Sequence, residues 1–375
     1  MTGVNKGACR NFIAVVVALL YLSLLSPALS SPQTATAPAR SILPGPKPPD
    51  VSLAWKQLVG IYGDGKTSTI LLERDSKLLW KLPAKTPWNR TGKLEWDVRV
   101  KADGNLDAGP QSAMVSMLLV PMRDGAGNVT QIDSGPLVLK RTDAGADPAH
   151  FFHVTPSKPV PELRAESLHV APPEEPGPFR KPDLVELTAL DPGFHLDIRY
   201  AQSNNFLSTP VYTQARAFMQ RPASEALQRA LKKLQPLGYG LLIHDAYRPW
   251  YVSKIFWDAT PPADHNFVAD PQKGSKHNRG CAVDLTLYDL ATGQAIEMPG
   301  LYDEMSARSF PTFPGGTSLQ RWHRDLLRKA IESEGFTVDG NEWWHFDYKD
   351  WKQYPILNVP FEDLGKLATP GGARP

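Results

Sequence analysis

Two hydrophobic patterns follow one another along the chain. Between residues 51 and 155, short apolar or alternating runs are separated by turn dipeptides such as Asp103-Gly104 and Asp124-Gly125. Alternation with a period of two residues, bounded by such turns, is typical of β-strands. The pattern predicts a small β-rich domain with strands within residues 69–72, 77–82, 94–100 and 113–120.

From about Asp183 the pattern changes to a mixture of helix and strand. Leu227, Leu231 and Leu234 have helical spacing, which predicts a helix that begins at a Ser224 cap and ends at the next glycine. A short apolar run at 241–243 indicates a buried strand.

A second helix is predicted nearer the C-terminus, where the apolar residues at helical spacing are Leu319, Trp322, Leu326, Leu327, Ala330 and Ile331. Gly335 follows and would end it. The irregular order of helices and strands favours an α+β fold over a regular βαβ array.

Two proline-rich tracts separate these regions. Residues 32–49 contain six prolines and residues 156–182 contain eight. Proline lacks a backbone N–H and fixes φ, so both tracts are expected to be extended linkers, at 31–50 and 156–182. The predicted organisation is an accessory domain at 51–155, a catalytic domain at 183–360 and a tail at 361–375.

The N-terminus has the features of a secretory signal. Lys6 and Arg10 precede an apolar run at 12–25, and residues 28–30 supply small side chains for cleavage. The run is shorter than the roughly 20 residues of a spanning helix. We expect a signal peptide at 1–30, a mature chain without a membrane span, and export to the periplasm or the medium.

Charge and cysteine content narrow the functional classes. The chain has 41 basic and 39 acidic residues, and loss of Lys6 and Arg10 with the signal would balance them. A balanced chain without basic blocks argues against nucleic acid as a partner. Cys9 would leave with the signal, so Cys281 would stand alone and no intramolecular disulfide is expected.

The segment 274–287 is the strongest candidate for part of a catalytic site. It places His277 and Asp284 seven residues apart. An imidazole and a carboxylate suit zinc, and a catalytic zinc site typically has three protein ligands and one open position. His345 is the natural third ligand, and Glu342 could act as general base beside the metal. Because residues three apart in a regular strand face opposite sides, we predict a bend between Glu342 and His345.

Two further residues allow more than one interpretation. Arg248 could stabilise an oxyanion, or it could be a structural ion-pair partner of Asp245. Cys281 could be a nucleophile only with an activating base, and His277 is no longer available as that base if it binds a metal. A buried small residue or an adventitious metal contact is the preferred interpretation of Cys281.

These segments resemble a known family. Residues 275–284 are similar to the Ser-x-His-x-x-Gly-x-Ala-x-Asp motif of zinc D-alanyl-D-alanine dipeptidases and carboxypeptidases, and residues 342–345 to their Glu-x-Trp-His motif. The dipeptidase branch is indicated by residues 197–201, 204–206, 245–249, 284–289 and 298–303. The resemblance covers about residues 183–355. Pro299-Gly300 and Tyr302 depart from the usual Gly-Thr and Phe of that branch.

The resemblance implies one Zn²⁺ per catalytic domain, bound by His277, Asp284 and His345. It also implies Glu342 as the catalytic base and Arg248 as the residue that stabilises the transition state. The expected activity is hydrolysis of D-alanyl-D-alanine or a related small D,D-dipeptide from peptidoglycan metabolism. A D,D-carboxypeptidase acting on longer wall peptides through an open cleft, and a non-catalytic wall-binding protein that binds through its β-rich segment, remain as alternatives.

Overall fold

The computed structural model describes residues 41–83, 89, 94–109, 116–143, 153–304 and 306–364. The predicted signal peptide, and Cys9 within it, lie outside these residues. Among the described residues, no helix is both long and apolar enough to cross a membrane.

The N-terminal region forms an antiparallel sheet in which each strand pairs with the next along the chain. Its strands are β1 (Gly60–Tyr62), β2 (Thr69–Arg74), β3 (Lys77–Lys81), β4 (Glu95–Val100), β5 (Leu106–Gly109), β6 (Met117–Arg123), β7 (Val129–Asp133) and β8 (Val138–Lys140). Backbone hydrogen bonds from Gly63 to Lys140 and from Thr142 to Ile61 join the last strand to the first. We call residues 51–143 the β-rich module.

Alternating apolar side chains fill the interior of this module. Leu71, Trp80, Leu106, Leu119 and Ile132 are all buried. The short helix α1 (Leu53–Leu58) precedes β1. The prediction of a β-rich region is confirmed, although residues 113–115 of the last predicted strand lie outside the described residues and β1, β5, β7 and β8 were not predicted.

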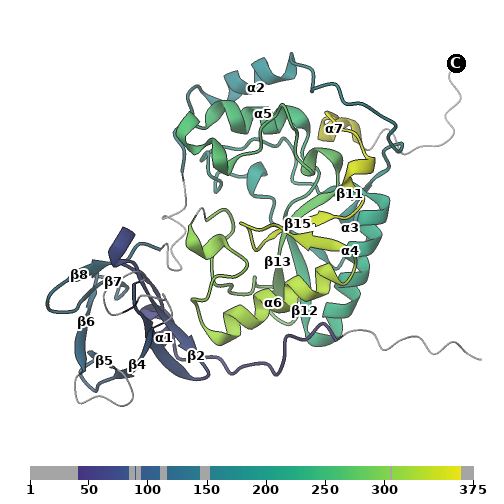
Figure 1. Ribbon diagram of the computed structural model, residues 1–375. Coiled ribbons are helices and arrows are strands. Elements are labelled where there is room, and N and C mark those ends of the chain that lie inside the picture. The colour runs from purple at the N-terminus through teal and green to yellow at the C-terminus, as the bar shows by residue number, and fades with distance from the viewer. Residues whose placement is uncertain are drawn as a thin grey trace, which may run out of the picture. The chain divides into compact units, whose positions relative to one another are not determined.

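The C-terminal region is built on a five-stranded sheet (Figure 1). Its strands, in spatial order, are β10 (Phe194–Leu196), β12 (Tyr239–Asp245), β13 (Ala282–Asp289), β15 (His345–Tyr348) and β14 (Phe336–Val338). Only β10 and β12 run parallel, and the other neighbours are antiparallel. A separate pair joins β9 (Leu184–Glu186) to β11 (Phe218–Gln220). A mixed sheet with interspersed helices agrees with the α+β prediction.

Two amphipathic helices, α4 (Arg221–Leu234) and α6 (Ser318–Glu332), pack against each other and against the sheet, as Figure 1 shows. In β13, alternation places Val283 and Leu285 on one face and Asp284 and Thr286 on the other. All four are buried. The sheet therefore has a polar row inside the molecule, and this row contains the predicted metal ligand Asp284.

The predicted cap of the first helix was wrong. The helix begins at Arg221, and the Ser224 hydroxyl donates to the carbonyl oxygens of Met219 and Gln220 within the first turn. Pro222 explains the earlier start, because proline fits the first turn of a helix. The second helix is capped by Thr317, whose Oγ1 accepts from the Gln320 backbone N–H.

Two expectations about linkers and ends also need correction. The tract 156–182 is not wholly extended, since it contains α2 (Val160–Leu168) with Pro161 in the first turn. Pro161 fits the first turn because its missing N–H would have no partner there, and the other prolines of the tract lie outside the helix. The segment after residue 360 is not a free tail at its start, because α7 (Phe361–Leu364) buries Phe361 completely in the core. The helices α5 (Trp250–Ala259) and α3 (Leu187–Leu190) complete this region.

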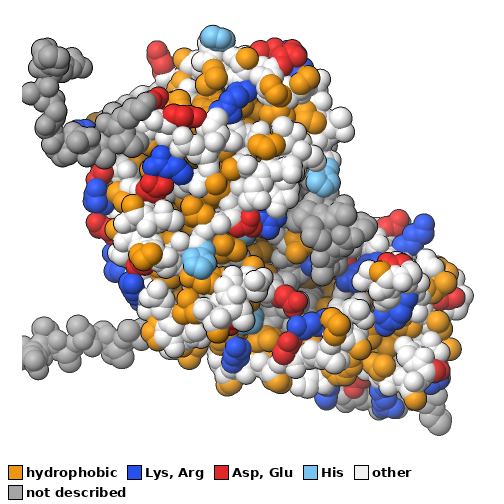
Figure 2. All heavy atoms as spheres, turned by 180° about the vertical axis from the view of Figure 1, so that it is seen from behind, with side chains coloured by type: hydrophobic (Ala, Val, Ile, Leu, Met, Phe, Trp, Pro, Cys, Tyr) orange, Lys and Arg blue, Asp and Glu red, His pale blue; other side chains and the backbone are white. Residues whose placement is uncertain are grey.

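Acidic and basic side chains are interspersed on the face of the molecule that Figure 2 shows. Salt bridges such as Arg221–Asp183 and Arg229–Glu334, both at 2.6 Å, pair many of the surface charges.

Candidate metal centre and active site

Strand register brings the three predicted metal ligands together. His277 begins a single 3₁₀ turn that ends at Gly280, whose φ of 67° reverses the chain into β13. Asp284 is the third residue of β13, and it lies directly opposite His345, the first residue of β15. Side chains at paired positions of antiparallel strands share one face of the sheet. The sheet thus holds two of the three residues, and the turn supplies the third.

The distances between the ligand atoms suit one small ion. His277 Nε2 lies 3.2 Å from His345 Nδ1 and 3.5 Å from Asp284 Oδ1, and His345 Nδ1 lies 3.0 Å from Asp284 Oδ1. Ligands about 2 Å from a tetrahedral metal ion are separated by about 3.3 Å. The observed spacings bracket this value, so these residues could hold a metal ion.

The outer nitrogen of each imidazole has a hydrogen-bond acceptor. Nδ1 of His277 donates to the Ala246 carbonyl oxygen at 2.6 Å, and Nε2 of His345 donates to Asp347 Oδ1 at 2.9 Å. Lys276 Nζ lies 2.6 Å from the other oxygen of Asp347. Such partners fix the ring orientation and the tautomer. The inner nitrogens therefore present their lone pairs to a shared point.

The charges at this point favour a bound cation. Burial alone would raise the pKa of Asp284, but the neighbouring imidazoles of His277 and His345 hold that pKa below its ordinary value. Burial alone would lower the pKa of His345, but Asp284 and Asp347 raise it. The carboxylates thus stabilise positive charge between the ligands, and a metal dication can replace the proton on His345.

Glu342 lies beside the cluster, as predicted. A turn closed by a hydrogen bond from the His345 N–H to the Glu342 carbonyl oxygen provides the expected bend, and Glu342 Oε2 lies 3.8 Å from His345 Nδ1. Burial, with a smaller contribution from the Asp284 carboxylate, raises the pKa of Glu342 to about 8 against the opposing effect of His345. A cation bound at the cluster would lower this pKa towards neutrality, where a carboxylate is a useful general base.

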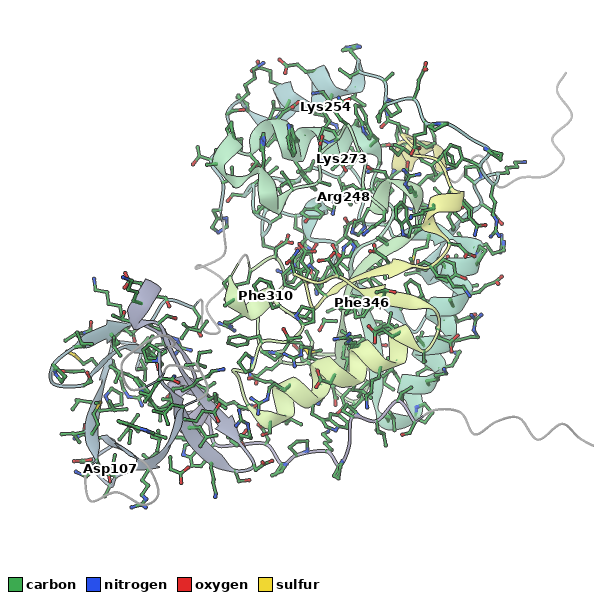
Figure 3. All side chains as sticks on the ribbon, in the orientation of Figure 1. Asp107, Arg248, Lys254, Lys273, Phe310 and Phe346 are labelled. Carbon is green, nitrogen blue, oxygen red and sulfur yellow. The ribbon has the colours of Figure 1, made fainter. Side chains whose placement is uncertain are left out.

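Both interpretations of Arg248 fit its position. Its Nε and Nη2 donate to Asp245 Oδ2 at 3.0 and 2.7 Å, and Asp245 Oδ1 accepts from the Tyr212 hydroxyl. Arg248 also lines the cavity that contains the metal ligands. Figure 3 shows polar side chains gathered between the labelled Arg248 and Phe346 of β15. Asp245 thus orients a guanidinium that retains N–H groups for a ligand.

The cavity is small, at about 120 Å³. The aromatic side chains of Tyr200, Phe206 and Phe256 form part of its wall, together with the ligands, Glu342, Arg248 and Asp303. Sites for drug-sized ligands typically have about 300–1,000 Å³. The cavity is therefore suited to a very small substrate.

Asp303 was not singled out from the sequence as a site residue. Its Oδ2 accepts from the Tyr200 hydroxyl at 3.0 Å, and its backbone has a φ of 57°. Burial, with a smaller contribution from the Asp284 carboxylate, raises the pKa of Asp303 to about 7. Only its place in the segment 298–303 pointed to it, and nothing in the local pattern separates it from a surface turn.

Tyr302 contacts one of the candidate metal ligands. Its hydroxyl lies 3.3 Å from Asp284 Oδ2, and its ring stacks on His244 with centroids 4.5 Å apart. The departure from Phe at this position thus adds a hydrogen bond to a candidate metal ligand.

Cys281 is fully buried, and burial raises its pKa to about 12. It has no thiolate at neutral pH, which agrees with the expectation of a buried small residue.

The chain is similar to known proteins over the region that contains the candidate site. A family model described as D-ala-D-ala dipeptidase matches residues 180–363. The D-alanyl-D-alanine dipeptidase of Escherichia coli (strain K12) is 35% identical over 179 residues, covering 48% of this chain and 91% of that protein. The protein of the same name from Enterococcus faecalis is 35% identical over 191 residues, covering 46% of this chain and 90% of that protein.

A third such protein, from Streptomyces coelicolor, is 32% identical over 192 residues, covering 45% of this chain and 92% of that protein. The resemblance inferred from the motifs is therefore confirmed, and it extends through the start of α7. The region that matches the family model lies after the β-rich module in the sequence. The chain belongs to the D-Ala-D-Ala dipeptidase family.

Proposed function

We propose that this protein is an exported zinc peptidase that hydrolyses D-alanyl-D-alanine. The observation that carries the proposal is the set of three ligand atoms 3.0–3.5 Å apart, next to the buried carboxylate of Glu342 in one small cavity. Two imidazole nitrogens and one carboxylate oxygen are ligands that suit zinc. The sequences of the relatives named above support the dipeptide as substrate.

The cavity supports a dipeptide rather than a longer peptide. A zwitterionic dipeptide brings an ammonium group, a carboxylate and one peptide carbonyl. Asp303 is a carboxylate outside the metal ligand set, so it can pair with the ammonium group. The rings of Tyr200, Phe206 and Phe256 can contact small methyl side chains. A carboxypeptidase would need room for the rest of the peptide, and a volume of about 120 Å³ provides little beyond a dipeptide.

Different residues of the site perform proton transfer, charge stabilisation and metal binding. Glu342 takes a proton from the attacking water and returns it to the amine of the leaving D-alanine. Arg248, held by Asp245, stabilises the negative charge that develops on the carbonyl oxygen. A bound zinc ion would supply Lewis acidity to the water and the carbonyl. His277, Asp284 and His345 would hold it, and Asp347 fixes the orientation of His345.

The test uses the chain beginning at Ser31 after removal of metal with a chelator. Release of D-alanine from D-Ala-D-Ala is measured with and without added zinc, with L-Ala-L-Ala and a wall pentapeptide ending in D-Ala-D-Ala as comparison substrates. Zinc-dependent cleavage of D-Ala-D-Ala alone is expected. Cleavage of the pentapeptide would replace the proposal with a carboxypeptidase, and no cleavage of any substrate would contradict both.

Export is proposed from the N-terminal segment alone, with Lys6 and Arg10 before the apolar run at 12–25. The full-length chain is expected to yield a shorter product outside the cytoplasm. N-terminal sequencing of that product should begin near Ser31. A full-length product retained in the cytoplasm would contradict this part of the proposal.

A further inference from the structure

A buried carboxylate of the β-rich module contacts a segment that lines the catalytic cavity. Asp143 follows β8, and its Oδ2 accepts from the Ile61 N–H at 3.0 Å while its Oδ1 lies 2.6 Å from Arg141 Nε. The same Oδ2 lies 3.6 Å from Nη1 of Arg308. The side chains of Asp143 and Arg308 are only 3% and 8% exposed, so their charges have little access to water.

Arg308 in turn joins the two ends of the segment on which it lies, and we call the described residues of this segment, 299–304 and 306–309, the cavity segment. Its Nε donates to the Pro299 carbonyl oxygen at 2.8 Å and lies 3.4 Å from Glu304 Oε2. Glu304 Oε2 accepts from the Leu301 N–H. A Cβ added at Gly300 would lie 2.6 Å from the Arg308 carbonyl oxygen, so only glycine allows the two ends of the segment to approach so closely.

The cavity segment contributes to the active site at two places. Tyr302 reaches the Asp284 carboxylate, and Asp303 lines the cavity. The Ser309 carbonyl oxygen accepts from the Trp343 N–H at 2.8 Å, directly next to Glu342. A displacement of the segment would therefore move both the proposed ammonium partner and the proposed base.

We propose that Asp143 is a positioning residue for the catalytic cavity, through which the β-rich module fixes the cavity segment by way of Arg308. This role rests on the proposed dipeptidase function. It gives the module a part in catalysis that requires no ligand of its own. Arg308 lies between the buried carboxylates of Asp143 and Glu304. Removal of the Asp143 charge leaves the buried guanidinium only partly compensated, so Arg308 is expected to shift and to move the cavity segment with it.

The energetic argument concerns geometry rather than overall stability. Buried ion pairs often add little net stability, because desolvation of the charges offsets their attraction. They do restrict the groups that they join, and small displacements of catalytic groups can cost about 100-fold in rate. The contact between Asp143 and Arg308 is thus expected to matter more for the cavity than for the melting temperature.

The experiment compares Asp143→Asn with Glu73→Gln in the full chain. Glu73 is a matched control, because it is also a buried carboxylate of the module and accepts from the Ser318 N–H at the start of α6, outside the residues that line the cavity. We expect kcat/KM for D-Ala-D-Ala to fall about tenfold in Asp143→Asn and to change less than about twofold in Glu73→Gln. Loss of contacts to Asp303 raises KM, and loss of contacts near Glu342 lowers kcat.

Hydrogen exchange gives a readout that does not depend on activity. In Asp143→Asn, amides of the cavity segment and of Trp343 should exchange faster, while those of β2 and β3 keep their protection. In Glu73→Gln the increase should be confined to the start of α6. Faster exchange throughout the module would show that Asp143 maintains the module itself, and would overturn the proposal.

Arg308→Gln approaches the same contact from the other side. If Asp143 acts through Arg308, the double variant should be no worse than Arg308→Gln alone, in both kcat/KM and exchange. Additive effects would overturn the proposal. Failure of the dipeptidase function would appear separately, as an inactive parent chain, and the exchange data would then still decide whether Asp143 holds the cavity segment.

Discussion

Asp347 accepts a hydrogen bond from the outer nitrogen of His345, two residues before it in the same strand, across 2.9 Å. The strand period of two places both side chains on one face, and Lys276 binds the remaining carboxylate oxygen. His345 is thereby held with Nδ1 towards Asp284 and His277. Orientation of this ligand thus depends on a residue outside the predicted ligand set.

Asp347→Ala is expected to weaken zinc binding about 10- to 100-fold, because the ring of His345 loses its orienting acceptor. Asp347→Asn should have a smaller effect, since its amide oxygen can still accept. Competition with a chromophoric chelator measures the affinity. Asp350→Ala is the control, because Asp350 pairs with Arg180 on the surface. Equal affinities for Asp347→Ala and the control would contradict the prediction.

Glu342→Gln should separate catalysis from metal binding. The amide cannot accept a proton, so kcat is expected to fall about 100- to 10,000-fold while zinc content stays near one per chain. His345→Ala should lose both zinc and activity, because it removes one of the three ligand atoms. Metal content is measured by elemental analysis. Near-normal turnover by Glu342→Gln would exclude it as the base.

Cys281→Ala should retain activity within about twofold and lose about 1 kcal/mol of unfolding free energy, as expected for a small cavity in a packed core. Its thiol is buried and protonated at neutral pH. Iodoacetamide should therefore label Cys281 only after denaturation. Rapid labelling of the folded chain, or an inactive but folded alanine variant, would revive the nucleophile interpretation.

His323 should make the protein less stable at acidic pH. Burial lowers the pKa of His323 to about 4, with Lys47 adding to the decrease, and its Nε2 lies 3.0 Å from the Tyr239 hydroxyl. The unfolded chain binds the proton near the ordinary pKa of 6.5. Between these values the unfolded state carries more protons, so the free energy of unfolding falls as pH decreases from about 6.5 towards 4.

Urea unfolding of the native chain and of His323→Gln at pH 7.5, 5.5 and 4.5 tests this dependence. The variant has no titrating group at this position, so its stability relative to the parent should improve as pH falls. A constant difference between the two proteins across this range would show that His323 is not linked to unfolding.

The candidate ligands could be predicted because each one carries a chemical signal at short range. His277 and Asp284 lie in one motif, and Glu342 and His345 in another. Asp347 could have been added from the strand period of two. Asp143 and Arg308 could not, because their meeting depends on how separate segments pack, and neither has a local pattern that differs from a surface charge.

The helical predictions succeeded where the apolar period was long and failed at the boundaries. The apolar stripes at 227–234 and 319–331 lie within α4 and α6. The cap at Ser224 was misplaced because Pro222 also favours a helix start. A Ser224 cap would begin the helix at residue 225, but the helix begins four residues earlier, at Arg221. In the tract 156–182, proline content hid a helix of nine residues, which has Pro161 in its first turn and the other prolines outside it.

The pairing order of the β-rich module has a consequence for how the chain assembles. Each of its strands contacts the strand made just before it, so its sheet requires only short loop closures until β8 meets β1. The five-stranded sheet instead places β15 between β13 and β14, and it cannot be completed before the chain reaches residue 348. Synthesis from the N-terminus therefore lets the module form first, and the active site is assembled last, against a surface that is already in place.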